Sequence, residues 1–272
     1  MKEFLQRYMP VDASVHGEQL DTLTAYVHWL MLVLFIFWGA FFLFTLWRFN
    51  KKRNPKASYA GMQSHWSTWG EAGVAIFEVI LLFGISIPAW YSWTNRPKKE
   101  TNPLEVRLVA EQFAWNVQYP GPDGKFGRRD VKLVDATNPL GLDPTDPDAK
   151  DDITTLNQLD VEVNRPVIVY ISSKDVIHSF SLPTMRVKQD AIPGMEVPVH
   201  FQPKMVNTEQ WEIACAQLCG LGHYRMRGML TVHDHAGFQT WLKEQGPEDT
   251  TEPEPNAVPA ATPAEPTTTA HS

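Results

Sequence analysis

A short stretch near the end of the chain gathers side chains that bind metals. Residues 215–226 read CAQLCGLGHYRM and hold two thiols (Cys215 and Cys219), an imidazole (His223) and a thioether (Met226). Thiolate and thioether are soft donors and imidazole is borderline, a combination that suits copper better than calcium or magnesium. A second imidazole, His178, stands upstream in the segment DVIHSF. These residues predict a metal centre.

The number of donors favours two metal ions over one. A blue-copper ion takes two His, one Cys and a weak axial ligand, so a second thiol is in excess. Two copper ions bridged by two thiolates, each with one imidazole, would use the whole set. Two alternatives remain open from the residues alone, a disulfide between the cysteines and a tetrahedral zinc site. The C-x-x-x-C-x-x-x-H spacing does not support covalent haem attachment. We assign no metal role to His65, His200, His233 or His235.

Two apolar runs precede this region. Residues 23–47 contain no acidic residue, lysine or arginine, and residues 73–93 contain one ionisable side chain, Glu78. About 20 apolar residues suffice to cross a bilayer as a helix. We therefore predict transmembrane helices over residues 23–48 and 73–94, after an N-terminal segment of residues 1–22.

The loop between the two helices sets their orientation. Residues 49–72 include Lys51, Lys52, Arg53 and Lys56, and basic short loops stay in the cytoplasm. This predicts a two-pass protein of a bacterial-type inner (plasma) membrane, with both termini and the metal centre on the external side. Carboxylates within a membrane are functional by default. Glu71 and Glu78 are thus candidates for proton handling, although Glu71 could be a solvated helix-start residue and Glu78 a neutral one against a partner.

The remainder of the chain reads as β-structure. Apolar and polar side chains alternate at 104–109 and 113–119, and strand-like runs follow at 159–163, 167–171, 197–201, 209–214 and 229–233. We predict an antiparallel sandwich or barrel over residues 103–245, with 121–158 as a long loop insertion. The cysteines and His178 would lie on loops that follow strands. Residues 246–272 are rich in proline and poor in apolar side chains, which predicts a disordered tail.

Composition narrows the function further. The net charge is −7, from 24 basic and 31 acidic residues. Such a chain lacks the basic surface that a nucleic-acid partner requires, so none is expected. Only two cysteines in 272 residues also exclude a small domain stapled by disulfides.

Two blocks, residues 175–194 and 215–226, resemble subunit II of the haem–copper oxygen reductases, which carries the binuclear copper centre (CuA) of cytochrome c oxidase. The resemblance implies a two-helix transmembrane hairpin followed by an all-β cupredoxin-like Greek-key sandwich or barrel. It also implies the ligands. Cys215 and Cys219 would bridge the coppers, His178 and Met226 would complete one ion, and His223 with the backbone carbonyl of Gln217 the other.

The resemblance implies partners as well. Electrons would arrive from cytochrome c and pass to haem in subunit I, where oxygen is reduced as protons are pumped, and subunit III is a further expected partner. Quinol oxidases share the fold but lack the copper ligands, so cytochrome c is the implied donor. A different class of function is a membrane-anchored copper carrier or assembly protein that relays no electrons.

Three positions depart from the family pattern. Gln217 stands where a glutamate often helps bind magnesium or manganese at the boundary with subunit I, which puts that ion in doubt. Phe113, with Trp115 as a second candidate, stands where a tryptophan usually receives electrons. In the family, a glutamate at the start of the second helix lies near the mouth of a proton path into subunit I. Counting back from Pro88 favours Glu71 over Glu78 for that position.

Overall fold

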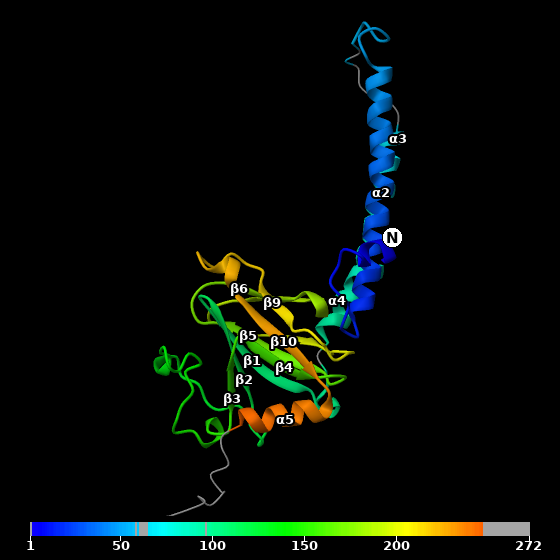
Figure 1. Ribbon diagram of the computed structural model, residues 1–272. Coiled ribbons are helices and arrows are strands. Elements are labelled where there is room, and N and C mark those ends of the chain that lie inside the picture. The colour runs from blue at the N-terminus through cyan, green and yellow to red at the C-terminus, as the bar shows by residue number, and fades with distance from the viewer. Residues whose placement is uncertain (1, 58, 60–64, 96, 247–272) are drawn as a thin grey trace, which may run out of the picture.

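The computed structural model describes residues 2–57, 59, 65–95 and 97–246. A helical hairpin projects away from a β-sandwich (Figure 1). The predicted hairpin followed by an all-β domain is therefore confirmed. The predicted disordered tail lies outside the described residues from position 247 onward.

The hairpin consists of a short helix α1 (Lys2–Gln6), the long helix α2 (Gly17–Arg48), and a return made of α3 (Trp66–Leu81), a π-helical turn (Leu82–Ser86) and α4 (Ile87–Thr94). Gly17–Arg48 and Trp66–Tyr91 are both long and apolar enough to cross a membrane. In a regular α-helix, Pro88 would lack an N–H and would clash with the carbonyl four residues back, that of residue 84. The π-helical turn Leu82–Ser86 lies at this point and accommodates the proline.

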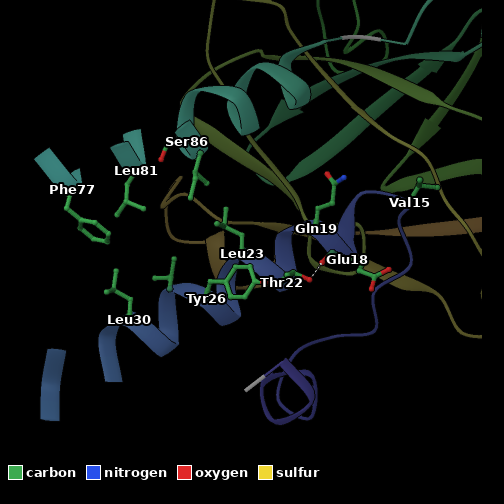
Figure 2. Close-up of a pocket in the computed structure, with 12 residues that line it drawn as sticks. Val15, Glu18, Gln19, Thr22, Leu23, Tyr26, Leu30, Phe77, Leu81 and Ser86 are labelled. Carbon is green, nitrogen blue, oxygen red and sulfur yellow. Dashed lines mark hydrogen bonds between the residues drawn. The ribbon is translucent and has the colours of Figure 1, made fainter. Parts of the chain in front are cut away.

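A groove of about 810 Å³ separates the two arms of the hairpin near the sandwich. Glu18, Gln19 and Thr22 line it on α2, and its apolar part includes Leu30 and Phe77 (Figure 2). The opposite face of α2 is buried near the N-terminus of the helix. This buried face carries three residues spaced four apart, Gly17, Asp21 and Ala25.

Two five-stranded sheets form the sandwich. The first has the order β3-β2-β1-β5-β8 and the second β4-β10-β9-β6-β7. The strands are β1 (Leu104–Glu111), β2 (Ala114–Tyr119), β3 (Ile153–Leu156), β4 (Gln158–Glu162), β5 (Val167–Ser173), β6 (His178–Leu182), β7 (Val187–Ala191), β8 (Val197–Phe201), β9 (Trp211–Cys215) and β10 (Arg227–His233). The pairs β1–β5 and β4–β10 are parallel. The expectation of purely antiparallel sheets was therefore wrong for those pairs.

Three strands lie where the sequence indicated loops. β3 falls inside the predicted insertion of residues 121–158, and two of its four residues are threonines. β6 and β7 form a hairpin between the runs predicted at 167–171 and 197–201. β6 reads HSFSL, and both of its serines are polar residues in a strand with little exposure. Polar and apolar side chains do alternate in β6, but only over residues 179–182, which is the shortest run that indicates a half-buried strand.

An aromatic core joins the sheets to the last helix, α5 (His235–Gln245). Phe238 is fully buried and stacks on Trp241 with ring centroids 5.7 Å apart, and Trp241 meets the edge of Tyr119 at 4.9 Å. Asp234 caps the helix by accepting a hydrogen bond of 2.7 Å from the backbone N–H of Gly237. α5 is thereby fixed against the sandwich.

Replacing Phe238 tests how much this packing stabilises the domain. We expect Phe238→Ala to lower the free energy of unfolding by about 3–5 kcal/mol, because a large buried ring leaves a cavity. Thr240→Ala, on the exposed side of the same helix, should change it by less than about 0.5 kcal/mol. Denaturant unfolding followed by near-UV circular dichroism measures both. Equal effects would mean that α5 is not part of the core.

Candidate metal centre

The loop between β9 and β10 carries most of the candidate ligands. Cys215 is the last residue of β9, and its backbone N–H donates to the carbonyl of Met226 at 3.3 Å. This bond closes the base of the loop and places a thiol opposite a thioether. A short 3-10 turn, His223–Arg225, then directs His223 back toward the cysteines.

Strand pairing brings in the distant histidine. His178 is the first residue of β6, not a loop residue as predicted, and it is fully buried. In the pairing of β6 with β9, Phe180 lies opposite Cys215. The backbone N–H of Ala216 continues this pairing by donating to the carbonyl of Ser179 at 2.9 Å. The register of two strands therefore fixes His178 beside the loop.

The six predicted ligand residues converge in one small volume. The Sγ atoms of Cys215 and Cys219 lie 3.8 Å apart. His178 Nδ1 is 3.9 Å from the first sulfur, and His223 Nδ1 is 3.7 Å from the second. The backbone oxygen of Gln217 lies 3.2 Å from Cys215 Sγ, and Met226 Sδ lies 3.7 Å from Cys219 Sγ.

Both cysteines are free thiols. A disulfide needs sulfurs about 2.05 Å apart, so this structure does not contain the alternative disulfide. Burial first, and then the hydrogen bond to Cys215, raises the pKa of the Cys219 thiol to about 11. Without a bound cation Cys219 therefore keeps its proton, and a metal ion must displace that proton to bind.

Asp175 orients the imidazole of His178. Its Oδ1 lies 2.9 Å from His178 Nε2, which leaves Nδ1 directed at Cys215. A carboxylate on the outer nitrogen of a ligand histidine fixes the ring and raises its basicity. Burial acts to raise the pKa of Asp175, but hydrogen bonds from His178, Gln112 and Val176 outweigh it and leave the pKa below its usual value.

Gln112 links the two ligand segments. Its backbone N–H donates to Asp175 Oδ2 at 2.7 Å, and its side-chain Nε2 donates to the carbonyl of Cys219 at 2.5 Å. Gln112 and Phe113 can lie this close to the ligand loop only because it contains glycines. A Cβ at Gly220 or Gly222 would collide with the side chains of Gln112 or Phe113. The sequence alone assigned no role to Gln112 or Asp175. These residues are 63 positions apart, so no local sequence pattern indicates that they contact each other.

The other predicted site residues lie around or away from this cluster. Trp115 is fully buried, and its ring meets that of His178 at 6.2 Å. Phe113 is half-buried against the ligand loop. Glu71 and Glu78 lie on α3, which projects away from the sandwich (Figure 1). His233 and His235 contact the carboxylates of Asp160 and Glu162 near α5.

The residues fit a copper centre by donor chemistry. His178, Cys215 and Cys219 present ligand atoms within 4.8 Å of one another, and all three are buried. Adding His223, Met226 and a backbone oxygen gives two thiols, two imidazoles, a thioether and a carbonyl in one place. Soft sulfur donors of this kind select copper over hard cations. The fold and this cluster define a membrane-anchored β-sandwich protein with a candidate metal site.

Comparison with known proteins identifies the family. The family described as cytochrome c oxidase subunit II, periplasmic domain, matches residues 104–232. An alternative cytochrome c oxidase subunit 2 from Bradyrhizobium diazoefficiens is 31% identical over 219 residues, covering 77% of each chain. The chain belongs to the cytochrome c oxidase subunit II family.

Other similar proteins carry the same description. Cytochrome c oxidase subunit 2 from Cereibacter sphaeroides is 25% identical over 245 residues, covering 85% of this chain and 78% of that one. The crystal structure of the periplasmic domain of cytochrome oxidase subunit II from Bradyrhizobium japonicum is 28% identical. It covers 52% of this chain and 92% of its own, with a TM-score of 0.38.

Removing the carboxylate behind His178 tests the assignment of the site. We expect Asp175→Ala to weaken copper binding by about 10–100-fold, the usual effect of losing an outer partner of a ligand histidine. Glu212→Gln removes a charge from an exposed position on β9, three residues before Cys215, and should leave the affinity unchanged. Competition with a copper chelator measures both. Equal affinities in the two variants would show that Asp175 does not orient a ligand.

Proposed function

We propose that this protein is the electron-receiving subunit of a proton-pumping cytochrome c oxidase, taking electrons from cytochrome c and passing them to haem in subunit I. The observation that carries the proposal is the buried cluster of His178, Cys215 and Cys219, with His223 and Met226 against its sulfurs. A binuclear copper centre held there would supply a one-electron carrier.

The chain's own residues divide the work of holding such a centre. Cys215 and Cys219 would hold both ions as thiolates. His178 and Met226 would complete the ligands of one ion, and His223 with the carbonyl of Gln217 those of the other. Gln217 offers only a neutral side chain for a further magnesium or manganese ion at the subunit I boundary, so we propose none.

Rigidity and dryness suit these residues to electron relay. Cys215 and Met226 are joined at the base of a β-hairpin, and His178 begins a paired strand. Ligands fixed in this way move little when the charge of the site changes, and a preorganised shell of this kind favours function. The buried Trp115 and the half-buried Phe113 keep water from two sides of the cluster.

The tip of the ligand loop offers a docking surface for the electron donor. Leu218, Leu221 and Tyr224 are 79%, 96% and 87% exposed, an unusual display of apolar side chains on one loop. Apolar and aromatic anchors commonly form the centre of protein interfaces. We propose that cytochrome c binds here and that Phe113, beneath the tip, receives the electron more readily than the fully buried Trp115.

The membrane part completes the proposal. Both termini and the copper domain face the external side, and the hairpin packs in the membrane beside subunit I, with subunit III a further neighbour. Glu71 or Glu78 on α3 would serve the mouth of a proton path in subunit I. The basic loop after α2 supports this orientation, because it favours the cytoplasmic side.

His223→Ala tests the ligand set. We expect the variant to lose the EPR signal of two equivalent coppers, because the loop then offers one imidazole fewer while the remote hairpin still inserts. The affinity for copper should fall by more than about 10–100-fold, which is the usual loss when only the hydrogen-bond partner of a ligand histidine is removed. His235→Ala, at an exposed histidine on α5, is the matched control. An unchanged signal in His223→Ala would remove this residue from the ligand set, and zinc without copper in the wild type would overturn the proposed function.

Leu221→Ser tests the docking surface. Loss of one apolar anchor should raise the KM for cytochrome c about tenfold, equivalent to about 1.4 kcal/mol of binding. The EPR signal and kcat should not change, because this almost fully exposed side chain offers no ligand atom. Val131→Ser, 88% exposed on the insertion, serves as control in steady-state oxidation of cytochrome c. If both variants keep the wild-type KM, the donor binds elsewhere.

A further inference from the structure

The segment before the first membrane helix is built into the copper domain. Residues 10–16, here called the N-terminal arm, run along the ends of β6 and β8. The backbone N–H of Ala13 donates to Thr184 at 2.9 Å, and the N–H of Lys204 donates back to Ala13 at 2.8 Å. Ala13 and Ser14 are fully buried. The arm therefore behaves as an added edge of the sandwich.

Two ion pairs reinforce this attachment. Lys204 Nζ lies 2.7 Å from Asp12 Oδ2 on the arm. Arg186, just after β6, holds Asp21 on α2 through two hydrogen bonds, at 2.8 Å from Nε and 3.1 Å from Nη2. The side chains of Asp21 and Arg186 are only 2% and 8% exposed. Paired planar groups of this kind are among the strongest and most directional contacts in proteins.

The Arg186 guanidinium connects three segments. Besides Asp21, it donates to the carbonyl of Pro10 on the arm at 2.9 Å and to that of Pro183 in its own turn at 2.6 Å. It thus ties the helix, the arm and the β6–β7 turn at a single point. No lysine could make this set of bonds, because an ammonium lacks the planar fork.

The backbone of Arg186 supports a specific requirement for its side chain. Its φ is +57°, in the left-handed region that glycine adopts without strain and that other residues rarely occupy. Glycine would suit this turn better if only the backbone mattered. A long charged side chain at a strained position points to a role for the guanidinium itself.

The position of Arg186 relates this contact to the metal centre. β6 begins at His178 and ends at Leu182, and the turn Pro183–Met185 leads directly to Arg186. One paired strand therefore has a proposed copper ligand at one end and the helix contact at the other. The hairpin is joined covalently to the sandwich through residues 95–103, and a single covalent link does not fix orientation, so the contacts of α2 and the arm must do so.

We propose that Arg186 and Asp21 form a clamp that sets the position of the copper centre over the membrane, with Arg186 as a positioning residue for electron transfer into subunit I. This inference rests on the proposed function. Electron transfer between centres falls steeply with distance, so a domain that can tilt on its tether would transfer electrons more slowly. The clamp acts on the step from copper to haem, not on donor binding.

The test compares Asp21→Asn, Arg186→Lys and Arg186→Ala in the whole oxidase complex. Each weakens the paired contact, and the first two retain a polar group of similar size so that the fold survives. We expect electron transfer from copper to haem, measured by flash-induced electron injection, to slow by about tenfold or more in Asp21→Asn and Arg186→Ala, because small misplacements are costly to rate. Arg186→Lys should recover part of the rate, since it keeps the charge.

Three further readouts separate positioning from general damage. The EPR signal of copper and the KM for cytochrome c should remain those of the wild type, which a disrupted fold would not allow. Amide hydrogen exchange at Ala13 and Val15 should quicken as the arm loosens. Lys150→Ala, an exposed charge on the insertion, is the control. A wild-type transfer rate in Asp21→Asn with copper present overturns the clamp, whereas loss of copper from the wild type would overturn the proposed function instead.

Discussion

The pairing of β6 with β9 is the constraint on which the candidate site depends. It places Phe180 opposite Cys215, and so brings His178, 37 residues away in the chain, to within 3.9 Å of the thiol. All other ligand candidates come from a single loop and need only local geometry. A shift of this register by one residue would turn His178 to the other face of its sheet. The metal chemistry of the loop is thus tied to the tertiary structure of the sandwich.

The ligand loop meets two demands that oppose each other. The proposed electron relay would need a dry and fixed site, and it would also need a partner protein to come close. The base of the loop, Cys215 and Met226, is buried and joined by a backbone hydrogen bond, while its tip, Leu221, is almost fully exposed. Gly220 and Gly222 allow Gln112 and Phe113 to press against the loop from beneath. Few atoms would therefore separate the candidate ligands from a protein bound at this exposed tip.

The sequence predicted the parts of the fold that local pattern encodes. The donor cluster of residues 215–226 is contiguous, and the apolar runs define the hairpin. The sequence-based prediction placed His178 on a loop because β6 has only five residues and its alternation of polar and apolar side chains spans only four of them. The contact of Gln112 with Asp175 spans 63 residues and has no local signature. The start of α2 at Gly17, six residues before the apolar run, likewise depends on tertiary contacts of Asp21.

The contacts of Asp21 also bear on how the two parts of the chain are oriented. A buried carboxylate is tolerated only when it is paired and hydrogen-bonded, so Asp21 can remain in the helix only while Arg186 stays in place. The same guanidinium bonds the arm and its own turn, so the helix cannot tilt without leaving several polar groups unsatisfied at once. Unsatisfied buried groups cost more than the bonds themselves contribute. The orientation of the sandwich is therefore held cooperatively, and β6 transmits it to the position of His178.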